Sequence, residues 1–139
     1  MANICLYKIK VKGTKLSCEK LIDIMPLYNW EKYILDTKGE EEDYEIVFLG
    51  ACKNHINAYT TSLKNPLPLT KEEIEKIEDG DYWTTTLCDK SILLNCEIFC
   101  NFKDIDNNGY AVYVHYKKGR EIFDECPKEI HIKRGRDYD

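Results

Sequence analysis

The chain has 139 residues and a formal net charge of −5, with 43% hydrophobic and 32% charged residues. This length fits one domain, 1–139, whose core needs neither a metal ion nor disulfides, with a tail at 134–139 that we expect to fray. The composition excludes a disordered protein, and the apolar runs are too short for a membrane span or a signal peptide. We therefore expect a cytoplasmic protein with no membrane association.

The charge is unevenly distributed. Residues 1–20 carry five lysines against Glu19, whereas 36–45 carries six acids against Lys38, and 71–81 six acids against two lysines. Acidic clusters disfavour non-specific binding to nucleic acid over most of the surface, although one small face could remain basic.

The N-terminal part reads as a strand followed by a helix. Tyr7, Ile9 and Val11 alternate with lysines up to Gly13, which predicts a strand with one buried face. Ser17 is a candidate cap for a helix that ends at Pro26. The segment 26–38 contains aromatic and apolar residues and fits an extension, a second short helix or a strand.

The middle of the chain contains one strand and short helices. Gly39 to Asp43 reads as a solvated loop, and Tyr44 to Leu49 as a strand closed by Gly50. A short helix is expected from about residue 54, before the rigid connector 65–68. The capping box at 70–73 predicts another helix, up to Gly80. The pattern leaves 82–91 undecided.

The C-terminal part reads as an antiparallel meander from Ile92 to Cys126. Every second residue from Ile92 to Phe102 is apolar, and a second alternation runs from Tyr110 to Tyr116. Turns at 104–109 and 118–119 predict a third strand over 120–126, and the tail adds a short strand through Ile130 and Ile132. The whole order predicts a single α+β domain with an antiparallel sheet of four to six strands and helices packed on one face.

Seven cysteines occur without a Cys-x-x-Cys pair or regular spacing. Cys5, Cys96 and Cys100 fall within strand patterns, where small hydrophobic residues are typical. We expect free buried thiols in a reducing cytosol rather than disulfides.

Short motifs along the chain resemble an uncharacterised family of small ferredoxin-like proteins from phages, prophages and mobile elements. The motifs are Met1-Ala-Asn-Ile-Cys5 leading to Val11-Lys-Gly13, Gly50-Ala-Cys52, Leu94-Asn-Cys-Glu-Ile-Phe99, His115-Tyr116, Gly119 and Asp124-Glu-Cys126. This sequence has Asp104-Ile-Asp-Asn-Asn where the family more often has a Pro-Gly turn. The resemblance implies a sheet that is ferredoxin-like in part and a phage-type setting in a bacterial host. It supplies no catalytic residues.

Neither of two metal patterns is complete. Asp104-x-Asp106-x-Asn108-Gly109 matches the first half of an EF-hand loop, but His115 stands where Ca²⁺ needs a bidentate Glu. Cys96 and Cys100 could join His115 in a zinc site, but strand residues four apart lie about 13 Å from each other. We therefore expect no metal and no cofactor.

From this resemblance together with the charge, the first choice for function is a non-enzymatic binding protein that occupies a basic surface of a host protein, such as a bacterial defence nuclease, in the manner of an anti-CRISPR inhibitor. Its acidic clusters would imitate phosphate charge. The candidate partner-binding residues are Asp36, Glu40, Glu41, Glu42, Asp43, Glu72, Glu73, Asp79, Asp81 and Trp83.

Two other functions stay open. Lys8, Lys10 and Lys12, together with Tyr113 on the same sheet face, could bind single-stranded nucleic acid by phosphate contacts and base stacking. An enzyme centred on His115, beside Glu97 or Cys100, ranks third, because no nucleophile or phosphate-loop motif accompanies the histidine.

Overall fold

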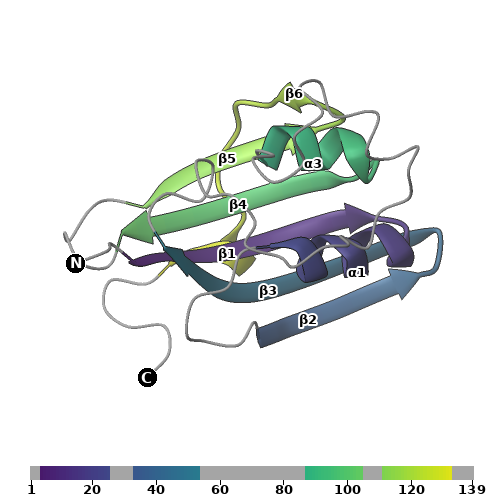
Figure 1. The fold of residues 1–139 in the computed structure, drawn as a ribbon, viewed down its shortest axis with the longest axis horizontal. Helices are drawn as coiled ribbons and strands as arrows, with labels where there is room; N and C mark the ends of the chain where they lie inside the picture. The colour runs from purple at the N-terminus through teal and green to yellow at the C-terminus, as the bar shows by residue number, and fades with distance from the viewer. Residues whose placement is uncertain (1–3, 26–32, 54–86, 105–110, 133–139) are drawn as a thin grey trace.

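The computed structural model of the chain describes residues 4–25, 33–53, 87–104 and 111–132. Its centre is a six-stranded sheet in the order β2-β3-β1-β4-β5-β6, with every neighbouring pair antiparallel (Figure 1). The strands are β1 (Ile4–Gly13), β2 (Tyr33–Glu40), β3 (Asp43–Lys53), β4 (Glu97–Asp104), β5 (Val112–Lys117) and β6 (Arg120–Glu121). The helices are α1 (Lys15–Ile24), α3 (Leu87–Leu93) and a short 3₁₀ helix, η2 (Lys128–Ile130). The antiparallel sheet of the expected α+β class is therefore confirmed.

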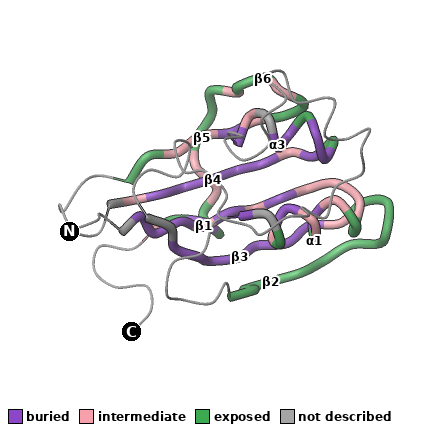
Figure 2. The backbone as a smooth tube through the Cα atoms, viewed as in Figure 1, coloured by how far each residue is buried: buried purple, intermediate pink, exposed green. Residues whose placement is uncertain are grey.

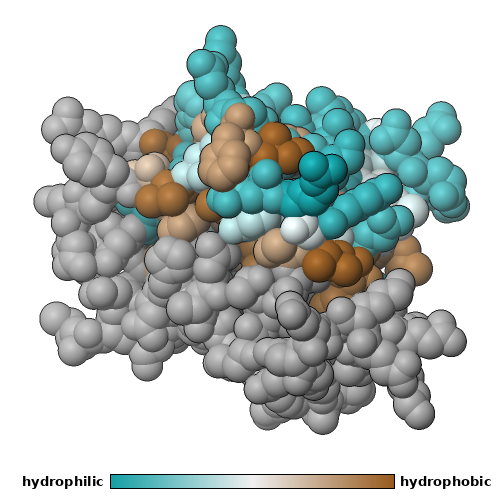
Figure 3. Space-filling view, turned by 90° about the horizontal axis from the view of Figure 1, so that it is seen from above, coloured by the Kyte–Doolittle hydropathy of each residue, from teal (hydrophilic) through white to brown (hydrophobic). Residues whose placement is uncertain are grey.

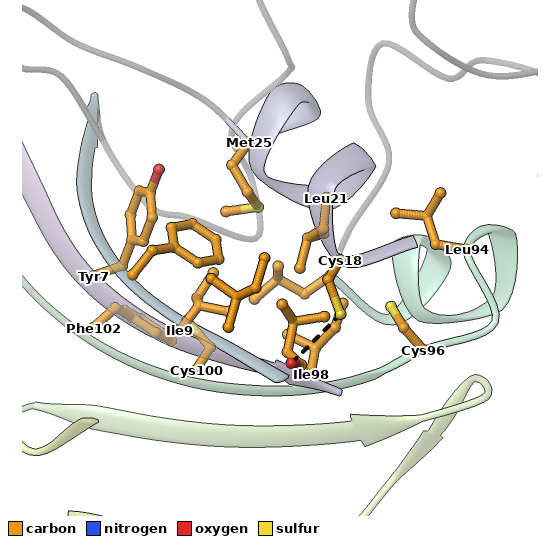
Figure 4. Close-up of a cluster of buried hydrophobic side chains, with 14 of the residues drawn as sticks. Tyr7, Ile9, Cys18, Leu21, Met25, Leu94, Cys96, Ile98, Cys100 and Phe102 are labelled. Atoms are coloured by element: carbon orange, nitrogen blue, oxygen red, sulfur yellow. Dashed lines mark hydrogen bonds between the residues drawn. The ribbon is translucent and has the colours of Figure 1, made fainter. Parts of the chain in front are cut away.

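The main core lies between the sheet and the two α-helices. β1 contributes Tyr7, Ile9 and Val11, which are fully buried, as the alternation predicted. Cys18 and Leu21 of α1 and Leu87 of α3 pack onto the same cluster, so both helices cover one face of the sheet (Figure 4). Alternating strand residues on this face meet the apolar sides of two helices, and their burial removes apolar surface from water.

Lysine alternates with these core residues on β1 and lies on the opposite face. A second, smaller cluster there contains Val47 of β3, Phe99 of β4 and Ile130 of η2. The segment 122–132, which we call the C-terminal strap, brings Ile130 to this face, where it is fully buried. Asn101 donates a hydrogen bond from Nδ2 to the carbonyl of Ile130 at 3.0 Å. The strap therefore covers part of the sheet face that carries the lysines.

Two helix expectations need correction. Helix α1 begins after Thr14, whose Oγ1 accepts a hydrogen bond from the amide of Ser17 at 3.1 Å, so Ser17 lies inside the helix and is not its cap. The expected strand start at Ile92 is wrong because 87–93 is helix α3. Its buried positions Leu87, Lys90 and Ser91 lie three and four residues apart, a helical spacing that coexists with the alternation beginning at Ile92.

Three strand and loop expectations also change. The loop expected over 39–43 is a hairpin with Glu41 and Glu42 as its turn, and the undecided segment 26–38 includes the start of β2. β6 covers only Arg120–Glu121, not 120–126, and the tail forms η2 where a strand was expected. The backbone of the strap instead receives bonds from side chains across the sheet, as Asn101 illustrates.

The sheet has two different edges. Figure 3 looks onto the molecule from the β6 side, where hydrophilic side chains predominate among the described residues. At the opposite edge, every residue of β2 is exposed (Figure 2). Within the described residues, no helix has the length and apolar character needed to cross a membrane.

Candidate functional site

The acidic residues at 36 and 40–43 lie on one exposed hairpin. We call residues 36–43 the acidic hairpin; its turn, Glu41–Glu42, joins the end of β2 to the start of β3. Gly39 has a φ of +101°, a conformation that L side chains rarely adopt, and it allows the chain to enter this tight turn. The amide of Lys15 donates to the carbonyl of Glu41 at 2.7 Å, which fixes the turn against the start of α1.

Among the described residues, the five carboxylates of this hairpin form no salt bridge. Asp36, Glu40, Glu41, Glu42 and Asp43 are all exposed, and none forms a salt bridge with another described side chain. The lysine within the hairpin, Lys38, instead bonds Oε2 of Glu45 at 3.1 Å. A hydrogen bond from Lys38 to Glu45 and the charge of that carboxylate raise the pKa of Lys38 above its ordinary value. The hairpin therefore presents a concentrated negative charge to the solvent.

An open hollow of about 420 Å³ lies between the turn and α1. It is lined by Thr14, Lys15, Leu16, Glu19, Glu41 and Glu42. Leu16 is 63% exposed there, so the acidic hairpin has an apolar neighbour. The remaining candidate partner-binding residues, Glu72, Glu73, Asp79, Asp81 and Trp83, lie outside the described residues.

The structure places the candidate nucleic-acid-binding residues on one sheet face but gives most of them internal partners. Lys8 donates to the carbonyl of His131 in the strap at 3.1 Å. Lys10 lies 3.6 Å from Oε1 of Glu45 and over the ring of Phe99. The hydroxyl of Tyr113 donates to Oδ1 of Asp124 at 2.9 Å.

His115 lies on this same face and is held between two carboxylates. Its Nε2 is 2.6 Å from Oε2 of Glu97, and its Nδ1 is 3.0 Å from Oδ2 of Asp124. The ring stacks on Phe99 with centroids 3.9 Å apart, and the residue is only 4% exposed. We call His115, Glu97 and Asp124 the histidine cluster.

The histidine cluster connects the strap to the sheet, because His115 of β5 contacts Asp124 of the strap and Glu97 of β4. A carboxylate oxygen lies within 3.0 Å of each ring nitrogen and His115 is buried, so neither nitrogen is open to a substrate. Cys100, which was considered as a partner of His115, does not lie beside it. Cys100 is in the core under the helices, on the other face of the sheet. Asp124 was missed by sequence reasoning, because only the path of the strap brings it to His115.

The buried cysteines are poor nucleophiles. The six cysteines whose side chains the structure describes are free thiols: Cys5, Cys18, Cys88, Cys96, Cys100 and Cys126. Burial raises the pKa of Cys18 and Cys96 to about 12, and it raises the pKa of Cys100 well above its ordinary value. Cys18 also lies 3.7 Å from the carbonyl of Val11, to which its thiol donates (Figure 4). Among the described residues, no group of three or more His, Cys, Asp or Glu side chains is arranged to hold a metal ion.

The raised pKa values predict slow alkylation of the folded protein. With iodoacetamide near pH 8, we expect Cys18, Cys96 and Cys100 to stay unmodified in the folded chain and to react rapidly in concentrated urea, because only thiolates react appreciably. Half-buried Cys88 serves as the internal reference. Peptide mass spectrometry measures each site, and equal rates at Cys100 in the folded and unfolded chain would contradict the packing.

The fold and the site define an antiparallel-sheet protein that presents an acidic hairpin at one edge and whose histidine cluster, with His115 buried, joins the sheet to the C-terminal strap. In comparisons with known proteins, no family model, no curated protein and no solved structure matches the chain.

Proposed function

We propose that this chain is a non-enzymatic binding protein whose acidic hairpin occupies a basic surface of a partner protein. The observation that carries the proposal is the group of five exposed carboxylates at 36 and 40–43, which form no salt bridge among the described residues. Such a group attracts a basic surface over a distance of about 10 Å at moderate salt and favours rapid association.

The class of partner follows from the chemistry that the hairpin resembles. A row of carboxylates on a rigid turn imitates the charge of a nucleic-acid backbone and therefore suits a groove that normally binds phosphates. Together with the resemblance to phage and mobile-element proteins, this supports a bacterial defence nuclease as the target and the cytoplasm of a bacterial host as the location. The other acidic segment, 71–81, would add to the same charge.

The ferredoxin-like part of the fold belongs to the same proposal. The order β2-β3-β1-β4, with α1 after β1 and α3 before β4, supports a β-α-β-β-α-β unit to which β5 and β6 are added. That arrangement would place the β2–β3 hairpin at a free edge of the sheet, where a partner can reach it.

Charge reversal on the hairpin tests the proposal. The variant Glu40→Lys/Glu41→Lys/Glu42→Lys should lose capture of a basic protein from bacterial lysate by roughly tenfold or more, because three attractive contacts become repulsive. The control Asp23→Lys/Glu121→Lys/Glu125→Lys changes the net charge equally at exposed positions away from the hairpin. Bound proteins are eluted with a salt gradient and identified by mass spectrometry, and their nuclease activity is then assayed with the purified chain.

The outcomes separate the possible functions. Salt-sensitive capture of a basic nuclease by the native chain and the control, but not by the hairpin variant, supports inhibition. Equal capture by all three, or no salt-sensitive complex with any basic protein, overturns it. Co-purifying RNA that disappears in Lys8→Ala/Lys10→Ala/Lys12→Ala would favour the alternative, a single-stranded nucleic-acid-binding module. That alternative is supported by the lysines and Tyr113 sharing one face.

A further inference from the structure

β2 is a long edge strand that is fully exposed and carries apolar side chains. β2 ends the sheet and has β3 as its one neighbour among the described strands (Figure 1). All eight of its residues are exposed, and the consecutive Tyr33, Ile34 and Leu35 are 49%, 57% and 50% exposed. The other edge is different, because β6 has only 2 residues.

Such an edge is a template for another strand. An edge strand presents unpaired N–H and C=O groups, and natural proteins usually protect it by making it very short or by giving it repelling charges. β6 follows the first rule. β2 has 8 residues, and the two charged residues at its centre, Asp36 and Lys38, have opposite signs, so they do not repel an identical strand placed antiparallel to them.

The centre of β2 is complementary to itself. Asp36 and Lys38 pair with Val47 and Glu45 of β3, and both therefore lie on the strap side of the sheet, two residues apart. If two β2 strands pair antiparallel about Thr37, Asp36 of each copy lies opposite Lys38 of the other, and the two Thr37 residues face each other. Opposite charges and threonine pairs at facing positions both stabilise antiparallel strands.

The apolar end of the strand fits the same register. A β-bulge lies between Ile34 and Asp36, so regular pairing on the outer edge begins at Asp36. In the register about Thr37, Leu35 of one copy lies opposite Gly39 of the other, Ile34 opposite Glu40, and Tyr33 opposite Glu41. Gly39 has no side chain, which leaves room for Leu35.

We propose that β2 is a homodimer interface, through which two copies of this chain form one continuous antiparallel sheet with a two-fold axis at Thr37. The interface is isologous, as closed dimers require, since each copy uses the same strand. The turn Glu41–Glu42 of each copy lies at an opposite end of the shared seam, so the dimer carries two acidic hairpins. The inference does not depend on what the hairpins bind.

A charge-swap series on the full chain tests this interface. Sedimentation velocity and thermal unfolding are measured over about a hundredfold range of protein concentration, since the unfolding midpoint of a dimer rises with concentration. Lys38→Asp and Asp36→Lys each place like charges opposite each other twice, so each should weaken dimerisation by roughly tenfold or more. The double variant Asp36→Lys/Lys38→Asp restores two opposite-charge pairs and should recover most of the affinity.

Lys117→Asp is the matched control. Lys117 is an exposed strand lysine that pairs in register with a glutamate, Glu97, as Lys38 pairs with Glu45, but it lies on β5. It should leave dimerisation unchanged. The proposal is overturned if the native chain is monomeric throughout, if Lys117→Asp weakens association as much as Lys38→Asp, or if the double variant does not recover. Intact dimerisation together with equal capture of basic proteins by the native chain and the hairpin variant would contradict the proposed function alone.

Discussion

Replacing Gly50 with alanine is expected to lower the free energy of unfolding by about 3 kcal/mol. Gly50 pairs with Tyr7 across the β1–β3 ladder, and the tyrosine ring lies over the glycine on the helix side of the sheet. A Cβ at residue 50 would lie 2.8 Å from Cε1 of Tyr7 and closer still to Cζ and Oη. Tyr7 is fully buried and packs edge-on against Phe48, so it has little freedom to move away.

Urea unfolding followed by circular dichroism measures this loss. Gly13→Ala is the matched control, because its added Cβ would lie 3.2 Å from Cβ of Cys96 at a strand end, which calls for a smaller adjustment. We expect that control to cost less than about 1 kcal/mol. In Tyr7→Ala/Gly50→Ala the clash is gone, so the double variant should lose less stability than the sum of the single ones. Equal losses at Gly50 and Gly13 would contradict the close approach of Tyr7.

Replacing His115 with alanine is expected to cost roughly 2–4 kcal/mol and to release the strap. The change leaves the carboxylates of Glu97 and Asp124 facing each other without the imidazole between them, and it removes the ring stacked on Phe99. The side chains of Glu97 and Asp124 are 19% and 39% exposed, so water screens part of their repulsion and the lower half of this range applies.

Hydrogen exchange separates a local effect on the strap from general destabilisation. In His115→Ala, the amides of 122–132 should exchange much faster than in the native chain, because the anchor at Asp124 is lost. The amides of β1 should be accelerated by a smaller factor. His115→Gln keeps one donor for a carboxylate and should show a smaller change. His131→Ala removes one exposed hydrogen bond to the carbonyl of Cys126 and serves as the control. An unchanged exchange pattern in the strap would show that the histidine cluster does not hold it.

Sequence periodicity predicted the elements whose burial alternates. β1 was read correctly because its side chains point in turn to a covered and a less covered face, and that pattern is local. β5 was also predicted as a strand, although its burial does not alternate: Val114 and Tyr116 are half-buried on the helix side, and His115 is buried on the other face. β2 stayed undecided because an exposed edge strand has no buried face to impose alternation. The start of β4 was wrong because Ile92, Leu94 and Cys96 alternate by coincidence across the end of a helix and a turn at Asn95, whose φ is +49°.

The candidate site was predictable from the sequence in part. Asp36 and Glu40 to Asp43 were recognised as a charged cluster, because charge density is a property of the sequence alone. Its position against α1, by contrast, depends on the bond from the amide of Lys15 to the carbonyl of Glu41, a contact between segments far apart in the chain. His115 was considered beside Glu97, and the β4–β5 register brings these two residues onto neighbouring strands of one face.

The sequence by itself determined the antiparallel sheet, the apolar face of β1 and the lysines opposite it, because all three follow from the period of a strand. Only the tertiary structure decided which face the helices cover, that the strap crosses the other face, and that Asp124 completes the histidine cluster. The physical reason is that these contacts join residues whose separation in sequence carries no pattern. Their pairing depends on how the segments of the chain pack against one another.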